Sequence, residues 1–276
     1  MRNTFAKYIT ELAKKDPRII LMMGDIGNRM FDEFKSIATD KFINCGIAEA
    51  NMMSMAAGLA LSGMRPFVYT ITPFVTLRCL EQIRISVAYH NAKVILVGTG
   101  SGLSYAELGP THHSLDDIGI LKMIPNLNLY TPCDPQEVKY CMNDALNSES
   151  ACYIRLGKKG EPNLDSDKLR ESFQYSRFLR TGKESIILGY GPILSEAIDA
   201  SEKIKNENNR IAVASMRRIV PLDSIFLKYL VKNNFKNWYI LEEHYKNGGL
   251  YSILLNWLYE NKLLNQINIK SISIPN

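Results

Sequence analysis

The sequence has no long apolar run and few cysteines. No stretch approaches the roughly 18 apolar residues that a membrane-spanning helix needs, and Met1 to Lys7 is polar and amphipathic, unlike a signal peptide. The five cysteines, at positions 45, 79, 133, 141 and 152, are odd in number and have no metal-ligand spacing, so we expect reduced thiols. These absences predict a cytoplasmic protein that neither spans a membrane nor is exported.

A dense charged face of one sign is also missing. The chain has 33 Lys and Arg against 28 Asp and Glu, and the formal net charge of +5 is spread along 276 residues. Basic clusters are short, as at Lys158–Lys159 and Arg217–Arg218, whereas nucleic-acid binding usually needs a denser basic face. The charge pattern therefore favours an anionic small molecule or an acidic partner protein over nucleic acid.

Short apolar segments alternate with helical stretches, which is the pattern of a parallel α/β sheet. In the first part of the chain we predict strands at residues 19–23, 67–71, 93–97 and 127–130, and helices at 5–15, 48–62, 77–89 and 135–147. In the second part we predict strands at 185–191, 210–215 and 238–244, and a helix at 193–206. The predicted fold class is α/β, with two domains that each contain a mainly parallel sheet flanked by helices.

A polar and irregular segment separates the two parts. It begins after Gly157 with the sequence Lys158-Lys159-Gly160-Glu161-Pro162. We therefore place a first domain at residues 1–158, a linker at 159–182 and a smaller second domain at 183–276. A chain of 276 residues is long enough for two domains that each bury a core.

Glu49 is a single carboxylate among almost entirely neutral neighbours, in the run from Cys45 to Ala60. A carboxyl group held in apolar surroundings tends to keep its proton and can act as an acid. The alternative is a water-exposed glutamate in the first turn of a helix, where the helix dipole favours a negative charge. The residues of this segment are compatible with both interpretations.

The first part of the chain, up to Gly157, resembles the pyrimidine-binding domain of the transketolase family, because it contains short motifs of that domain in the same order. They are Gly46–Met52, Gly63–Tyr69, Pro73–Phe74, Glu81–Arg84, Gly109–His113, Ile124–Leu127, Pro132–Asp134 and Tyr153–Gly157. The second part of the chain is similar to the C-terminal domain of that family. The resemblance implies thiamine diphosphate with Mg²⁺ as cofactor, and transfer of a two-carbon ketol unit between sugars or sugar phosphates.

The resemblance also implies roles for residues around the cofactor. Glu49 matches the glutamate that hydrogen-bonds N1′ of the aminopyrimidine and thereby activates the cofactor, and Ile47 lies in the same cofactor-binding segment. Phe74 matches an aromatic ring that stacks on the pyrimidine, although an ordinary core phenylalanine is the alternative. His112 matches a histidine that faces the substrate, where an imidazole can bond substrate oxygens and move a proton.

Three further residues are expected on the substrate side. Arg155 aligns with an arginine that grips the substrate phosphate, which suits a guanidinium because it can donate two parallel hydrogen bonds. Asp25 lies where the family has a substrate-channel loop, and His113 lies beside His112.

A metal site is the alternative for the acidic and histidine-rich loop formed by His112, His113, Asp116 and Asp117. Adjacent histidines on a short loop rarely converge on one ion, so we predict no metal ligand in this chain. We then expect His113 and Asp117 to contact His112 and to hold its side chain in position.

The sequence departs from the family pattern in two places. It reads Thr99-Gly100-Ser101-Gly102 where sugar-phosphate transketolases carry a His or Arg, which indicates a donor or acceptor unlike the usual pentose phosphate, for example a sugar bearing a nucleotide or no phosphate. The Gly-Asp-Gly motif that binds the diphosphate and Mg²⁺ is also absent from these residues. The resemblance therefore implies a separate subunit with the diphosphate-binding domain, and a heterotetramer that contains a homodimer of this chain.

Two other functions fit the same fold. One is the β subunit of a 2-oxo acid dehydrogenase-type thiamine enzyme, and the other is a non-catalytic partner protein. The segments Thr111–His113 and Ile154–Gly157 look more like the ketol-transfer branch, and the joint presence of Glu49, Phe74 and His112 argues against a non-catalytic protein.

Overall fold

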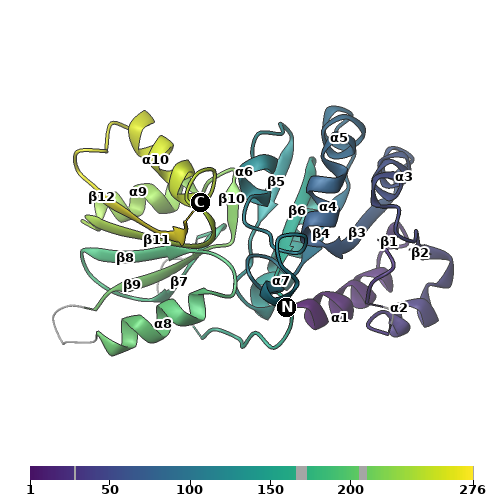
Figure 1. Cartoon of the computed structure of the whole chain (residues 1–276), viewed down its shortest axis with the longest axis horizontal. Coiled ribbons are helices and arrows are strands. Elements are labelled where there is room, and N and C mark those ends of the chain that lie inside the picture. The colour runs from purple at the N-terminus through teal and green to yellow at the C-terminus, as the bar shows by residue number, and fades with distance from the viewer. Residues whose placement is uncertain (28, 166–172, 205–209, 276) are drawn as a thin grey trace.

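The computed structural model describes residues 1–27, 29–165, 173–204 and 210–275, which form two sheets side by side (Figure 1). The larger sheet has seven strands in the order β10-β5-β6-β4-β3-β1-β2. All of its pairings are parallel except that of β10 with β5. Its strands are β1 (Ile19–Met23), β2 (Phe42–Asn44), β3 (Arg65–Ile71), β4 (Ile95–Thr99), β5 (Leu127–Tyr130), β6 (Ala151–Leu156) and β10 (Arg218–Val220).

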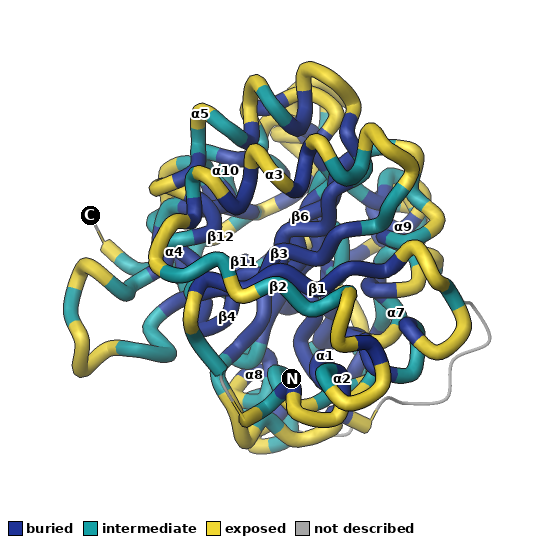
Figure 2. The backbone as a smooth tube through the Cα atoms, turned by 90° about the vertical axis from the view of Figure 1, so that its right-hand side faces the viewer, coloured by how far each residue is buried: buried dark blue, intermediate teal, exposed yellow. Residues whose placement is uncertain are grey.

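Helices cover both faces of this sheet, so its central strands are almost continuously apolar. One face is covered by α1 (Arg2–Ala13), α2 (Asp32–Ile37) and α7 (Pro135–Asn147). The other is covered by α3 (Glu49–Leu61), α4 (Thr72–Val75), η2 (Leu77–Cys79), α5 (Leu80–Gln82), η3 (Ile83–Tyr89) and α6 (Asp117–Leu121). Short 3-10 turns η1 (Thr39–Lys41) and η4 (Ala106–Leu108) lie in connecting segments. Figure 2 shows the strands buried between these two layers.

The smaller sheet has the strand order β12-β11-β8-β9-β7, and only β7 runs antiparallel to its neighbour. Its elements are β7 (Ser176–Arg180), β8 (Ser185–Gly189), α8 (Leu194–Lys203), β9 (Ala212–Met216), α9 (Ser224–Lys232), β11 (Asn237–Tyr245), α10 (Leu250–Glu260) and β12 (Asn268–Ile274). The predicted α/β class with two mainly parallel sheets is confirmed.

Three details differ from the sequence prediction. β7 lies inside residues 159–182, which we expected to form a linker, while residues 166–172 of that segment lie outside the described residues. β10 lies within the second part of the chain but pairs with β5 in the first sheet. The predicted helix at 193–206 is observed as α8 (Leu194–Lys203), and residues 205 and 206 are not described.

The single helix predicted at 77–89 is instead three short segments that end in a π-helix of seven residues, η3. The backbones of Thr76 (φ −108°, ψ −81°) and Cys79 (φ −111°, ψ 16°) leave the α-helical region and interrupt the run. Arg78 lies between these two breaks. A sequence pattern cannot show such interruptions because the apolar spacing still fits a continuous helix.

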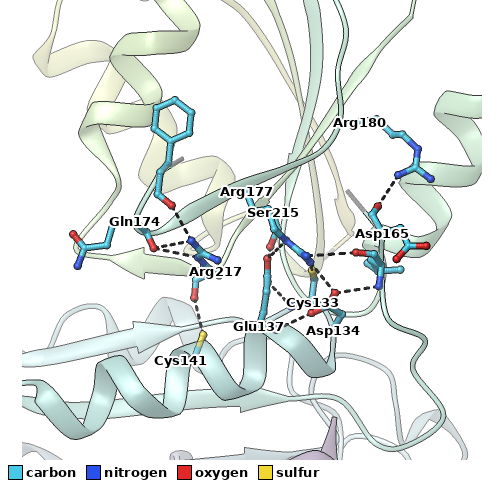
Figure 3. A network of polar contacts seen from close by, with 12 residues as sticks. Cys133, Asp134, Glu137, Cys141, Asp165, Gln174, Arg177, Arg180, Ser215 and Arg217 are labelled. Carbon is cyan, nitrogen blue, oxygen red and sulfur yellow. Dashed lines mark hydrogen bonds and ion pairs between the residues drawn. The ribbon is translucent and has the colours of Figure 1, made fainter. Parts of the chain in front are cut away.

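A buried network of charged groups joins the two sheets where α7 begins (Figure 3). Asp134 caps α7 by accepting a hydrogen bond from the Glu137 backbone, and Pro135 occupies the first turn. Arg177 of β7 donates to Asp134 at 2.7 Å and to Glu137 at 2.9 Å. Ser215 of β9 donates to Glu137 at 2.8 Å. Because both carboxylates are buried and paired, this network fixes α7 against the second sheet.

Candidate active site

The connections around β1 reverse the strand order at the carboxyl edge of the larger sheet. β1 pairs with β2 on one side and with β3 on the other. The connection from β1 to β2 runs through α2 on one face of the sheet. The connection from β2 to β3 runs through α3 on the opposite face. Ligands of open α/β sheets bind outside the strand ends at such a reversal of strand order. The predicted residues Asp25, Glu49 and Phe74 follow β1, β2 and β3 respectively, so the fold brings their segments to this edge.

Glu49 begins α3 and its side chain is only 3% exposed. It lies against Gly24, where an added Cβ would come within 3.3 Å of Glu49 Cγ and 3.2 Å of Thr70 Oγ1. Thr70 Oγ1 is itself buried and has no hydrogen-bond partner among the residues that the structure describes. The water-exposed interpretation of Glu49 is therefore wrong, although its position in the first helical turn is as expected.

Glu49 does not lie among neutral groups, which corrects the expectation from its sequence neighbours. Arg78 Nη1 donates to Glu49 Oε1 at 2.7 Å. The guanidinium carbon of Arg78 also lies 4.0 Å from the centre of the Phe74 ring. The Arg78 side chain is 43% exposed, so its outer part stays in contact with solvent while it pairs with the buried carboxylate.

His112 extends this group of side chains on the far side of Phe74. The two ring centres are 5.2 Å apart in an edge-on arrangement, and His112 Nδ1 lies 2.9 Å from Thr111 Oγ1. The ring of Tyr105 lies 6.1 Å from that of His112. A Cβ on Gly100 would fall 2.0 Å from the Tyr105 ring, so Tyr105 can pack here only because residue 100 is glycine.

Lys158 is a residue of this site that the sequence interpretation missed. It follows β6 at the same edge, and its Nζ lies 4.4 Å from the centre of the Tyr105 ring and 3.0 Å from Glu107 Oε1. The sequence did contain a signal, because Lys158 comes directly after Gly157 at the end of a motif-bearing segment. In the sequence alone, Lys158 belongs to a short basic cluster at the start of a polar, irregular segment.

Two other predicted residues, Asp25 and Ile47, are exposed at the same edge of the sheet. Asp25 is exposed, adopts a positive φ of 52°, and accepts a hydrogen bond from Asn44 Nδ2 at 2.9 Å, which ties the ends of β1 and β2 together. Ile47 is 80% exposed. A third predicted residue, His113, has its Nε2 3.1 Å from the Ala106 carbonyl oxygen. This contact links two parts of the loop that carries His112.

Arg155 is placed differently from its predicted role as a phosphate anchor. It is fully buried, and its guanidinium donates to Asp117 at 2.9 Å and to the carbonyls of Ser114 and Glu243 at 2.8 and 3.0 Å. These contacts join the His112 loop to β11 of the second sheet. Nε and Nη2 are engaged by these three internal acceptors, so the structure supports a role inside the fold, and the phosphate anchor stays a prediction.

The part of the chain that the structure describes contains neither a candidate metal site nor a candidate membrane-spanning helix. There, no three His, Cys, Asp or Glu side chains are gathered as a metal ion would need, and this includes the loop that carries His112. Within the same residues, none of the helices combines the length and the apolar character needed to cross a membrane.

Two family descriptions match the chain. "Transketolase, pyrimidine binding domain" matches residues 1–161, and "Transketolase, C-terminal domain" matches residues 174–275. These matches cover the two sheets described above.

Relatives with the same extent are named as subunits. The chain is 29% identical to a subunit of apulose-4-phosphate transketolase from Phocaeicola vulgatus, over 99% of this chain and 87% of that protein. It is 30% identical to a subunit of 6-deoxy-6-sulfo-D-fructose transketolase from Clostridium sp. strain MSTE9, over 81% of this chain and 70% of that protein. A solved structure described as "Split gene transketolase, inactive beta4 tetramer" superposes with a TM-score of 0.87 at 27% identity, covering 100% of this chain and 89% of that one.

Proposed function

This chain belongs to the transketolase family, and from that membership we propose that it is the pyrimidine-domain subunit of a split, thiamine-diphosphate-dependent transketolase. The proposed reaction transfers a two-carbon ketol unit between sugars. The observation that carries the proposal is that a buried carboxylate, Glu49, and a partly exposed aromatic ring, Phe74, both contact the Arg78 guanidinium at the carboxyl edge of the sheet. Relatives of the same extent that are named transketolase subunits support it.

The residues present fit the pyrimidine part of thiamine diphosphate. Phe74 offers a flat apolar surface for stacking, and Glu49 offers a buried carboxylate for the ring nitrogen N1′. Gly24 leaves open the space that a side chain would fill, and the orphaned Thr70 Oγ1 lies at the same place. When bound, the cofactor supplies a nucleophilic carbon that attacks the sugar carbonyl and carries the two-carbon unit.

The chain itself contributes orientation and proton handling. Glu49 shares a proton at N1′, and its burial excludes the water that would otherwise compete for that hydrogen bond. Phe74 sets the plane of the ring. His112, 5.2 Å from Phe74 between ring centres, is placed to bond the substrate hydroxyl and carbonyl oxygens and to move a proton between them.

The substrate class follows from Lys158 rather than from Arg155. Lys158 is partly exposed at the carboxyl edge and lies beside Tyr105, which in turn faces His112. Lys158 pairs with Glu107 at 3.0 Å, but this pair is open to solvent, unlike that of Arg155 with Asp117. The ammonium group can therefore exchange Glu107 for the anionic end of a sugar whose carbonyl end lies near His112. We therefore propose a sugar with a phosphate or sulfonate group, the two anionic classes that appear in the names of its relatives.

The diphosphate and Mg²⁺ are assigned to a separate subunit. Two relatives that this chain spans over 87% and 70% of their length are named as transketolase subunits. The proposed assembly is a heterotetramer with two copies of each chain, in which this chain forms a homodimer. The neighbour described as an inactive tetramer of β chains suggests that this chain alone associates with itself without activity.

The test is titration calorimetry with thiamine diphosphate and Mg²⁺, on this chain alone and mixed with a candidate diphosphate-binding subunit from the same genome. Binding by the mixture, followed by ketol transfer from a panel of phosphorylated and sulfonated ketoses, is the expected result. Tight binding by this chain alone would overturn the assignment of the diphosphate to a partner. No binding by the mixture would overturn the transketolase function.

A further inference from the structure

Arg78 makes both of the contacts that the proposed function assigns to the aminopyrimidine ring. Its planar guanidinium lies 4.0 Å from the centre of the Phe74 ring, and one of its N–H groups donates to Glu49 at 2.7 Å. The two contacts are made by one side chain at the same time. Arg78 therefore lies between the ring and the carboxylate that would otherwise hold the cofactor.

We infer that Arg78 is an internal substitute for the aminopyrimidine, which closes the pyrimidine pocket until the cofactor displaces it. The inference rests on the proposed function, because it takes Glu49 and Phe74 as the pyrimidine contacts. A guanidinium suits this role since it is flat, donates from nitrogen and stacks on aromatic rings.

The contact with Arg78 satisfies the buried charge of Glu49. Glu49 is 3% exposed, and a buried carboxylate without a partner is strongly destabilising. Arg78 supplies the opposite charge and a hydrogen bond. When Glu49 takes up a proton and shares it with N1′ of a pyrimidine ring, the carboxyl group no longer carries an unpaired charge, and Arg78 is no longer needed there.

The Arg78 side chain can move away from Glu49 and Phe74 into solvent. It is 43% exposed, so its guanidinium can rotate into water without losing much buried apolar contact. The segment that carries it is interrupted at Thr76 and Cys79 rather than locked in one continuous helix. The pocket thus opens by movement of one side chain, with Phe74 and Glu49 staying in place.

The consequence is competition between Arg78 and the cofactor. Binding must break a hydrogen bond between charged groups and a cation–π contact before the ring can enter, and this lowers the apparent affinity. Replacing Arg78 by Met, which has similar length but no charge, should tighten cofactor binding by about tenfold, as expected for one charge-assisted hydrogen bond. Arg78→Lys keeps the charge but not the flat group, so its affinity should lie between the two.

The experiment measures the dissociation constant of thiamine diphosphate with Mg²⁺ by calorimetry, on the complex of this chain with its diphosphate-binding subunit. Arg84→Met is the matched control. Arg84 is an exposed arginine in the same helical run, next to Ile85 and Tyr89 and outside the pocket. Crystal structures of the complex with and without cofactor supply a second measurement, the position of the Arg78 guanidinium.

Each outcome decides the inference. Tighter binding by Arg78→Met but not by Arg84→Met, with Arg78 turned away from Glu49 in the loaded crystal, would support it. Unchanged or weaker binding by Arg78→Met and Arg78→Lys would overturn it and leave the proposed function standing. Absence of binding by the native complex and by every variant would remove the proposed function, and the inference with it.

Discussion

Glu49 and Arg78 are far apart in the sequence, yet Glu49 Oε1 and Arg78 Nη1 lie 2.7 Å apart. The carboxylate is buried at the start of α3, and the guanidinium reaches it from the interrupted helical run after β3. This ion pair places a cation in a site that the local sequence describes as neutral. It also gives the buried carboxylate a partner of opposite charge.

Replacing Glu49 by Gln should abolish turnover of the reconstituted enzyme, or slow it by at least about a hundredfold, because an amide cannot share a proton with N1′ as a carboxylate does. The thermal unfolding midpoint should change little, since the shape is kept and Arg78 is partly hydrated. Steady-state ketol transfer and differential scanning calorimetry check both statements. Near-normal turnover would remove the cofactor-activation role.

Lys158→Ala should raise KM for a phosphorylated or sulfonated sugar by about tenfold, with little change in kcat, because it removes one charge-assisted contact to the anion. Lys159→Ala is the matched control, since Lys159 has the same charge and is exposed beside it. Equal effects of the two variants would point to general charge attraction, and no effect of either would exclude Lys158 as the anchor.

Arg155→Ala should act on stability rather than on KM. It would leave Asp117 buried beside the carbonyls of Ser114 and Glu243 without its cation, at a cost of roughly 3–5 kcal/mol in the free energy of unfolding. Denaturant titration measures this cost. The double variant Arg155→Met with Asp117→Asn should recover part of it, because no unpaired charge remains. A stable Arg155→Ala protein with a raised KM would restore the phosphate-anchor role.

Gly24→Ala should lower turnover while the fold persists. The new Cβ would meet Glu49 Cγ at 3.3 Å and Thr70 Oγ1 at 3.2 Å, so the carboxylate must shift by a few tenths of an ångström. Such displacements of a reacting group are costly to catalysis. Gly58→Ala is the control, because nothing lies within 4 Å of its added Cβ on the exposed side of α3. It should stabilise the helix by about 1 kcal/mol and leave turnover unchanged.

Glu242 should make stability depend on pH. Burial raises the pKa of this carboxyl, even though it accepts hydrogen bonds from the Leu250 and Tyr251 backbones at the start of α10 and from Tyr190. The folded state therefore binds the proton more tightly than the unfolded state. Its contribution to stability is full below the ordinary glutamate pKa and is lost as the pH rises through the raised value.

Comparison with Glu242→Gln isolates this contribution, because glutamine does not titrate. The unfolding midpoint of the native protein should fall relative to that of the variant as the pH rises from about 4 to about 7. Scanning calorimetry over this range measures it. A difference that stays constant, or that moves in favour of the native protein, would contradict the prediction.

Much of the fold was predictable because its signals are local. The apolar run of β1 is buried on both faces, and it was predicted with the bounds that are observed. The start of α7 was predictable from Asp134-Pro135, a cap followed by a proline in the first turn. β10 was not, because a strand of three residues becomes a strand only through its pairing with β5.

The candidate site was predictable in part for the same reason. Glu49, Phe74 and His112 were found from motif-bearing segments, and the fold places Phe74 beside His112. Lys158 and Arg78 were missed because their positions depend on strand order and on a break in a helix. Arg155 was assigned to the substrate because a sequence cannot show that Asp117 and two carbonyls already occupy its guanidinium.

The sequence alone determined the α/β class and the residues available for chemistry, since strand and helix periodicity and short motifs are written in consecutive residues. Only the tertiary structure decided which charges meet. Parallel strands bring distant segments to one edge of a sheet, and burial strengthens whatever pairs form there. The partners of Glu49 and Arg155 were therefore settled by packing rather than by sequence proximity.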